Sequence, residues 1–180
     1  MIKNYFDIII IGAGVSGLIL ANEIIERTDK SVLVLEKKGH FKDTKNLCFW
    51  NKPNNILIKN VDNRWKDICV LINNKKIKLK SDGIEYLRIK SNKLFSFFVN
   101  KLKKEAKFKL LLNQEISSLK KKNSKVRISS NRVIYNTSLV FDSRVNHISN
   151  NSEKLLQHFY GVELALDKNL INHKEVVLMD

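Results

Sequence analysis

Three glycines and one glutamate have the types and spacing best suited to chemistry in this 180-residue chain. Gly12, Gly14 and Gly17 stand in the stretch GAGVSG, which matches the pattern G-x-G-x-x-G, and Glu36 ends a later apolar run. The chain has only six glycines, so half of them lie in this short stretch. A motif of this kind, placed between a strand and a helix, holds the pyrophosphate of a dinucleotide against the helix N-terminus.

Each part of the motif has its own physical task. The first glycine makes the tight turn out of the strand, the second lets a pyrophosphate approach bare backbone, and the third lets the helix pack closely on the sheet. The acid at the end of the second strand accepts hydrogen bonds from the adenosine ribose hydroxyls. The predicted cofactor-binding residues in this part of the chain are Gly12, Ala13, Gly14, Val15, Ser16, Gly17, Glu36 and Lys37.

The surrounding sequence predicts the elements that position this motif. Residues 6–11 are largely apolar and predict a strand that is buried on both faces. Residues 15–27 predict a helix, because apolar side chains recur along one face at helical spacing. Residues 31–36 predict a second buried strand. Together they form a strand–helix–strand unit, which favours a right-handed parallel crossover.

The remaining sequence predicts short strands and one further helix. The helix should begin at a cap formed by Ser91 or Asn92 and end near residue 107, whereas residues 37–55 should form a loop with an aromatic anchor. The other strands are expected at residues 69–80 (a hairpin turning near Asn73 and Asn74), 86–90, 108–112, 115–120, 125–130, 132–136, 138–144, 158–166 and 175–180.

This order of elements predicts an α/β fold. We expect a Rossmann-type FAD/NAD(P)-binding domain with a parallel sheet, inserted antiparallel strands and a three-strand β-meander. Residues 1–157 should form this domain, and residues 158–180 should begin an incomplete substrate domain.

Charge and composition restrict the class of protein. The hydrophobic content is 43%, and the net charge is +15, from 33 basic and 18 acidic residues. The lysines indicate either an ordinary solvated surface or a contact with an anionic membrane. No nucleic-acid-binding motif accompanies them, so no nucleic-acid partner is expected. No run of residues approaches the roughly 18 apolar positions that a membrane-spanning helix needs.

Cysteines and histidines form no catalytic or metal-binding pattern in the sequence. Cys48 and Cys69 are not part of a CxxC pair, and the four histidines are scattered without ligand spacing. We therefore expect no metal site, and a reducing cytosolic setting fits. Phe95 and its aromatic neighbours predict the core and flank of a helix rather than cofactor contacts.

The glycine motif alone does not choose between NAD and FAD. Its place near the N-terminus, and a glutamate rather than an aspartate at the end of the second strand, are typical of FAD enzymes. The later meander and the segment LVFDSR at residues 139–144 favour the same cofactor.

Motifs that occur in order along nearly the whole chain resemble those of the lycopene cyclases, FAD-dependent enzymes that cyclise carotenoids. The resemblance begins with FDIIIIGAGVSGLILANEI and continues through VLVLEKK. Its more specific parts are CFW at residues 48–50, QHFYGVEL and VVLMD. The segments YLRIKSNKLFSFF and LVFDSR, with its D-x-R strand end, are also similar to family members.

The resemblance implies a cofactor, a substrate, several site residues and a cellular location. It implies FAD as cofactor, with NAD(P)H as an external reductant, and a linear carotenoid whose ends are protonated and closed into rings. It implies that Asp142 and Arg144 lie near the adenosine half of FAD, and that Trp50 lies on the flavin and substrate side. It further implies a substrate domain with an apolar tunnel, in a cytoplasmic enzyme that makes peripheral contact with an anionic membrane.

Two departures limit what the resemblance implies. Val145 stands where the D-x-R strand end usually continues with glycine, and the sequence ends at Asp180 whereas family members run much further. The acidic catalytic motif and a late glycine-rich flavin contact are therefore expected beyond this sequence, and no catalytic residue is assigned. Two alternatives stay open: an inactive FAD-domain fragment, or another FAD-dependent oxidoreductase such as an isoprenoid reductase or a hydroxylase.

Overall fold

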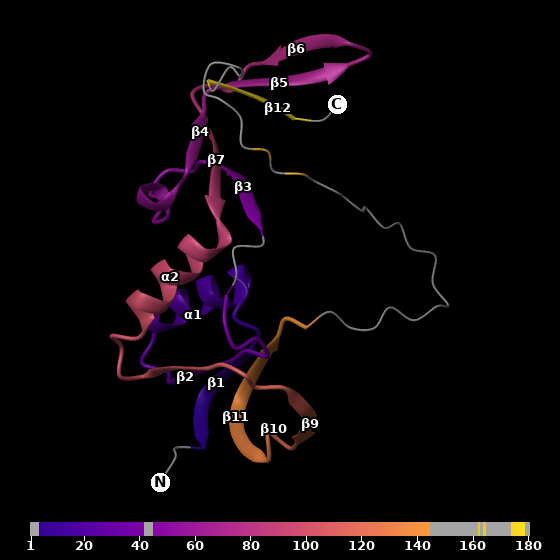
Figure 1. The fold of residues 1–180 in the computed structure, drawn as a ribbon. Helices are drawn as coiled ribbons and strands as arrows, with labels where there is room; N and C mark the ends of the chain where they lie inside the picture. The colour runs from indigo at the N-terminus through magenta and orange to yellow at the C-terminus, as the bar shows by residue number, and fades with distance from the viewer. Residues whose placement is uncertain (1–3, 42–44, 145–161, 163, 165–173, 179–180) are drawn as a thin grey trace. The chain divides into compact units, whose positions relative to one another are not determined.

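A computed structural model of the chain describes residues 4–41, 45–144, 162, 164 and 174–178. The chain divides into two compact units, residues 1–47 with 89–145 and residues 48–88 with 146–180. Figure 1 identifies the helices and strands of both units by label and by colour along the chain. The predicted domain boundary at residue 157, and the strand expected at residues 158–166, fall almost entirely outside the described residues.

The first unit is built on a six-stranded sheet in the order β8-β2-β1-β11-β10-β9. The first four strands in this order run parallel, and β11, β10 and β9 form an antiparallel meander. The strands are β1 (Tyr5–Ile11), β2 (Val32–Leu35), β8 (Phe108–Leu111), β9 (Ile116–Lys122), β10 (Lys125–Ser130) and β11 (Val133–Asp142). This architecture confirms the predicted α/β class with a parallel sheet and a three-strand meander.

Helix α1 (Val15–Arg27) connects β1 to β2, and its bounds are those that the sequence predicts. Strands β1 and β2 form the centre of the core, because nearly all of their side chains are buried. A second helix, α2 (Ser91–Leu102), contacts α1. Figure 1 shows the glycine turn region between the end of β1 and the start of α1, which is where the predicted site lies.

Strand β11 is a single strand of 10 residues, where the sequence predicts two strands separated by a polar step. Thr137 and Ser138 lie at this step, and the hydroxyls of both donate hydrogen bonds to the backbone carbonyl of Asp7, at 2.9 and 2.8 Å. Thr137 is fully buried. The prediction of two strands is wrong because these polar side chains find partners in the neighbouring strand, so the ladder continues through them.

The N-terminus of α2 differs from the prediction. Lys90 occupies the N-cap position and no side chain caps the helix, so the expected cap by Ser91 or Asn92 is wrong. The Ser91 hydroxyl instead accepts a hydrogen bond from the backbone N–H of Lys45 at 3.3 Å, and the Ser91 N–H donates to the Lys45 carbonyl at 3.0 Å. These bonds tie the start of α2 to the segment that follows residue 44.

Helix α2 also ends earlier than predicted, at Leu102 instead of near residue 107. The chain then makes a turn in which the Phe108 N–H donates to the Glu105 carbonyl at 3.0 Å. The Lys107 carbonyl accepts a hydrogen bond from Val32 of β2 at 2.8 Å. The helix therefore stops where the chain must extend to pair with the parallel sheet.

The second unit contains most of two small sheets. One has the order β3-β7-β4 and consists of β3 (Asn46–Trp50), β7 (Tyr86–Lys90) and β4 (Asn63–Trp65). Strand β3 lies in the segment predicted as a loop, so that prediction is wrong there. Its pairing with β7 is extended by a hydrogen bond from the Asn51 N–H to the Glu85 carbonyl at 2.8 Å. Pairing over a long sequence separation leaves no local periodic signal.

The other small sheet has the order β12-β5-β6. Its strands are β5 (Asp67–Ile72), β6 (Lys75–Leu79) and β12 (Glu175–Val177). Asn73 and Asn74 both have positive φ, at 50° and 61°, as a two-residue hairpin turn requires. The predicted hairpin is therefore confirmed. In the described part of the chain, no helix has the length and apolarity needed to cross a bilayer.

Candidate dinucleotide-binding site

Gly12 makes the turn that leads out of β1. Its φ of +102° lies in a region that other residues rarely adopt, and a side chain there would collide with the hydroxyl oxygen of Ser143. Its N–H donates to the Leu35 carbonyl of β2 at 2.7 Å. The fold itself therefore requires glycine at this position.

Gly17 lies in the first turn of α1, where the helix crosses the end of β1. A Cβ at this position would collide with the Gly12 carbonyl oxygen and would lie 3.4 Å from the Cγ2 atom of Ile10. The helix approaches the strand this closely only because the side chain is absent. The packing of α1 on the sheet therefore also requires glycine.

Gly14 is different, because neither its backbone conformation nor a contact with a described residue requires glycine there. It is the N-cap of α1 with φ −69° and ψ −178°, an extended conformation that any residue adopts. A Cβ on Gly14 would meet no atom of the described residues within 4 Å. No side chain caps α1, and no acidic residue lies in its first turn. Apart from the Glu36 carboxylate beside Ala13, the N-terminus of α1 faces open space among the described residues, which suits an anionic group.

Glu36 follows β2 and its carboxylate is joined to the glycine turn. Its Oε2 atom accepts a hydrogen bond from the Ala13 N–H at 2.7 Å, and its Oε1 atom accepts one from the Lys38 N–H at 2.8 Å. The backbone of Glu36 is held by Leu111 and Gln114 at the end of β8. The structure therefore brings the predicted acid and the predicted loop together.

A cavity of about 480 Å³ opens beside the turn and Glu36. Its wall contains predicted site residues together with lysines and apolar side chains that were not predicted as site residues. The lining residues are Ala13, Gly14, Val15, Leu18, Glu36, Lys38, Gly39, His40, Phe41, Lys45, Leu47, Ser91, Leu94 and Phe95. The cavity therefore extends from the glycine turn to the first turns of α2, within the first unit.

Two kinds of cavity residue, lysines and a phenylalanine of α2, were missed by sequence reasoning. Lys38 and Lys45 supply positive charge, but in a chain with 33 basic residues no pattern distinguishes them. Phe95, expected at the flank of a helix core, lines the cavity and stacks on Phe41. Only the packing of α2 beside α1 brings Phe95 to the site.

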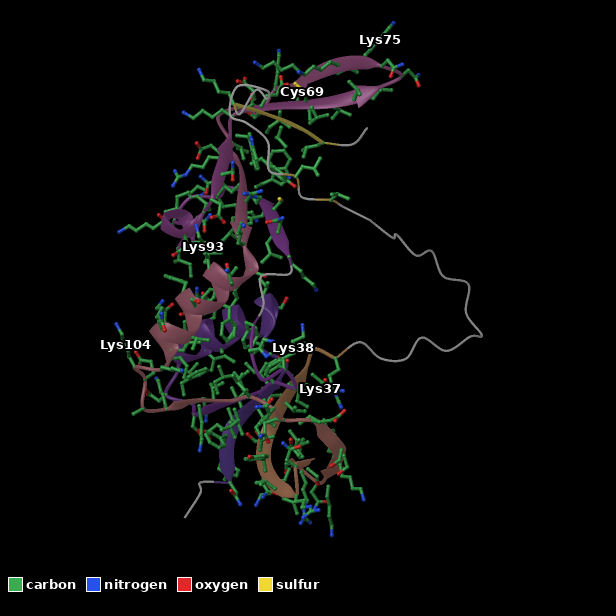
Figure 2. All side chains as sticks on the ribbon, in the orientation of Figure 1. Lys37, Lys38, Cys69, Lys75, Lys93 and Lys104 are labelled. Carbon is green, nitrogen blue, oxygen red and sulfur yellow. The ribbon has the colours of Figure 1, made fainter. Side chains whose placement is uncertain are left out.

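Lys37 does not line the cavity. Its Nζ atom lies 2.7 Å from Oε1 of Glu115, and both side chains are largely exposed. The hydrogen bond from Lys37 lowers the pKa of Glu115. The next residue, Lys38, lines the cavity in its place. Figure 2 labels both lysines.

Asp142 and Arg144 lie at the end of β11, next to the end of β1. Asp142 pairs with Ile11 in the parallel ladder, so the D-x-R segment is adjacent to the glycine turn. The Arg144 guanidinium bonds to both carboxylate oxygens of Asp142, with the closest distance 2.6 Å from its terminal nitrogen. Between them, the Ser143 hydroxyl donates to the Ile11 carbonyl at 2.7 Å. Neither Asp142 nor Arg144 lines the cavity.

The Asp142 carboxylate has a distinct pH dependence. Hydrogen bonds from the Arg144 side chain hold the pKa of Asp142 below its usual value, with burial acting in the opposite direction. Stability from this pair is present above the usual pKa of an aspartate and is lost as the pH falls through the lowered pKa.

We expect Arg144→Met to raise the pKa of Asp142 toward its usual range, as measured by NMR titration of the carboxyl carbon. An unchanged pKa in the variant would show that Arg144 does not stabilise the charge.

Trp50 belongs to the second unit. Its side chain is 46% exposed and its ring lies 4.9 Å from that of Tyr86, measured between centroids. Cys48, two residues earlier in β3, is exposed, and partial desolvation of its thiol raises its pKa, so the thiol stays protonated at neutral pH. Among the described residues no group of three metal-ligating side chains occurs.

Comparison with known proteins places these features in a family. Residues 7–180 match the family model of the lycopene cyclase protein. Over 37 residues the chain is 54% identical to UDP-galactopyranose mutase of Mycoplasma genitalium, a stretch that covers 21% of this chain and 9% of that protein.

Solved structures share the fold at low sequence identity. The p-nitrophenol 4-monooxygenase PnpA of Pseudomonas putida is 14% identical with a TM-score of 0.62, covering 78% of this chain and 41% of that one. The halogenase PltM, solved in complex with phloroglucinol and FAD, is 14% identical with a TM-score of 0.61, covering 77% and 34%. The chain therefore spans less than half the length of these two proteins.

Proposed function

We propose, since this chain belongs to the lycopene cyclase protein family, that it binds FAD and contributes the nucleotide-binding part of a carotenoid-cyclising flavoprotein. The glycine turn would hold the pyrophosphate, and Glu36 would bind the ribose hydroxyls of the adenosine. Lys38 and Lys45 line the same cavity and would offset the charge of the phosphates. Asp142 and Arg144 would support the adenosine side from the end of β11.

The observation that carries this proposal is the open space in front of Gly14. Gly12 and Gly17 are required by the fold, whereas, in the part of the chain that the structure describes, no atom lies within 4 Å of a Cβ placed on Gly14. A glycine that the protein does not need is explained by a ligand that must approach the backbone. The uncapped helix and the adjoining cavity of about 480 Å³ fit the same ligand.

The reaction that we propose for the complete protein is the closure of the ends of a linear carotenoid into rings. Bound reduced flavin would assist the protonation of the substrate without net redox change, with NAD(P)H as the external reductant. Trp50 would lie on the flavin and substrate side. Because the substrate dissolves in lipid, the enzyme would be cytoplasmic and in peripheral contact with an anionic membrane.

The experiment that tests the proposal separates cofactor binding from catalysis. The purified chain should retain flavin, which visible absorption and release of free FAD on denaturation would show. The chain should then be expressed in lycopene-accumulating cells, alone and together with any coding sequence that follows Asp180. We expect cyclic carotenoids only in the second case, since no acidic catalytic motif was found in this sequence. Cyclic carotenoid from the chain alone would overturn the assignment as the nucleotide-binding part.

A purified chain without flavin, and without affinity for added FAD, would contradict the proposal. A chain that holds flavin but forms no ring in either case would favour the alternative of an FAD-binding fragment without activity. This second candidate is supported by the fact that the chain covers only 41% and 34% of the lengths of the two solved structures.

A further inference from the structure

The β5–β6 hairpin has two faces of different chemistry. Residues directly opposite in an antiparallel ladder project to the same side of the sheet. The pairs Ile68 with Leu79, Val70 with Ile77, and Ile72 with Lys75 therefore share one face. We call the aliphatic members of these pairs the apolar face, which consists of Ile68, Val70, Ile72, Ile77 and Leu79.

The exposure of the apolar face increases toward the turn. Ile68 at the base of the hairpin is fully buried, whereas Leu79 is 39%, Ile77 46% and Ile72 51% exposed. Three large aliphatic side chains are thus exposed as neighbours on two strands, unlike the single exposed side chains of an ordinary surface. Figure 1 shows β5 and β6 as the two strands of a hairpin, and Figure 2 labels Lys75 at its turn end.

The opposite face of the hairpin is charged and internally neutralised. Lys76 forms an ion pair with Glu175, and Lys78 pairs with Asp67 at 2.5 Å. These bonds raise the pKa of both lysines, which therefore stay charged at neutral pH. The Cys69 thiol donates to the second oxygen of Glu175 at 3.1 Å. The acidic groups of the sheet are therefore directed away from the apolar face.

The hairpin keeps an excess of positive charge, because only two of its five lysines form these ion pairs. Residues 66–80 contain five lysines and a single acidic residue, Asp67. Lys75 lies on the same face as the exposed aliphatic side chains, at the turn. An aliphatic strip bordered by lysines matches the interface of an anionic bilayer, where the aliphatic groups enter the acyl boundary and the lysines meet the headgroups. A second copy of this chain would present the same lysines, so like charges would oppose its docking.

We propose that the apolar face of the β5–β6 hairpin docks this protein on an anionic lipid surface. The inference rests on the peripheral membrane contact in the proposed function and identifies the surface that makes it. The lysines attract the hairpin to the headgroups, and insertion of Ile72, Ile77 and Leu79 retains it there. Binding should therefore need both anionic lipid and an intact apolar face.

The test compares two substitutions that change charge equally. Ile77→Asp places a carboxylate on the apolar face, and Leu119→Asp places one on β9, where Leu119 is 38% exposed beside Lys120, Lys121 and Lys122. Each full-length chain is sedimented with vesicles of phosphatidylglycerol and phosphatidylcholine in equal parts, and with vesicles of phosphatidylcholine alone. We expect Ile77→Asp to lower the partition coefficient on the anionic vesicles about tenfold or more, and Leu119→Asp to change it less than about threefold. Binding to the neutral vesicles should be weak for all three proteins.

The outcomes separate docking from flavin binding. Retained flavin in both variants would show that they are folded. Equal losses in the two variants would overturn the proposal, since binding would then follow net charge alone. A wild-type chain that holds flavin but binds no vesicle would also overturn it, while leaving the cofactor proposal intact.

The same test also detects whether a second copy of this chain, instead of lipid, covers the apolar face. If Ile77→Asp abolishes a dimer seen by size-exclusion chromatography without lipid, and vesicle binding is unaffected, the apolar face is an interface between copies and the proposal is wrong. If flavin is absent but vesicle binding depends on Ile77 as expected, docking stands and the proposed cofactor fails.

Discussion

Replacing Gly14 with valine is expected to abolish the retention of flavin while leaving the fold intact. The substituted side chain would enter the open space at the N-terminus of α1, where a pyrophosphate approaches the backbone. The backbone of Gly14 is extended, with φ −69°, so valine causes no strain there. We expect the affinity for FAD to fall at least about a hundredfold, which corresponds to about 2.7 kcal/mol.

Titration with FAD, followed by quenching of flavin fluorescence, measures this effect. Gly14→Ala serves as the smaller member of the series and should give an intermediate loss. The midpoint of thermal unfolding, measured without cofactor, should fall only slightly in both variants, because alanine and valine are poorer N-cap residues than glycine. An unchanged affinity of Gly14→Val for FAD would remove the argument that this glycine exists for a ligand, and with it the main support for the site.

Replacing Gly17 with alanine is expected to destabilise the protein strongly. Glycine to alanine in a helix normally stabilises it by up to about 1 kcal/mol. Here the added Cβ would collide with the Gly12 carbonyl oxygen, which is backbone and cannot move aside by rotation. Helix α1 would have to shift away from β1, so we expect the free energy of unfolding to fall by about 3 kcal/mol.

Chemical denaturation of the cofactor-free chain, followed by circular dichroism, tests this expectation. Gly14→Ala is the matched control, because it makes the same chemical change three residues earlier, where no atom lies within 4 Å of the new Cβ. The control should lose no more than about 1 kcal/mol, which is the cost of replacing an N-cap glycine with alanine. Equal stability of Gly17→Ala and the wild type would show that α1 can tilt away from the strand without cost.

Local patterns in the sequence were sufficient for the β1–α1–β2 unit. The bounds of α1 follow from helical spacing and the glycine turn, and those of β1 and β2 from two apolar runs. The turn of the β5–β6 hairpin was equally predictable, because Asn73 and Asn74 tolerate positive φ. Each of these features is decided by residues that are near one another in the chain.

The elements that were predicted wrongly depend on distant partners. Strand β11 continues through Thr137 and Ser138 because their hydroxyls reach the backbone of Asp7. Strand β3 exists because β7 pairs with it, and α2 ends at Leu102 because the chain must then pair with β2. No local signal reports such partners.

The candidate site shows the same division between local and distant information. The glycine motif and Glu36 were identified from spacing, and the structure joins them through the bond between Glu36 and Ala13. The choice of Lys38 over Lys37 as a cavity residue, and the arrival of Phe95 from α2, depend on how the chain packs.

Sequence alone determined that this chain has a glycine turn between a buried strand and a helix, an acid at the end of the next strand, and a basic hairpin. Only the tertiary structure decided why each glycine is there. Gly12 and Gly17 are in contact with protein atoms that exclude a side chain, whereas Gly14 faces open space. Only the tertiary structure, too, separated the faces of the hairpin, because strand register decides which side chains share a face. The physical reason is the same for the glycines and for the hairpin. Residue spacing along the chain specifies local conformation, whereas the close approach of atoms and the exposure of a side chain depend on which distant residues pack beside it.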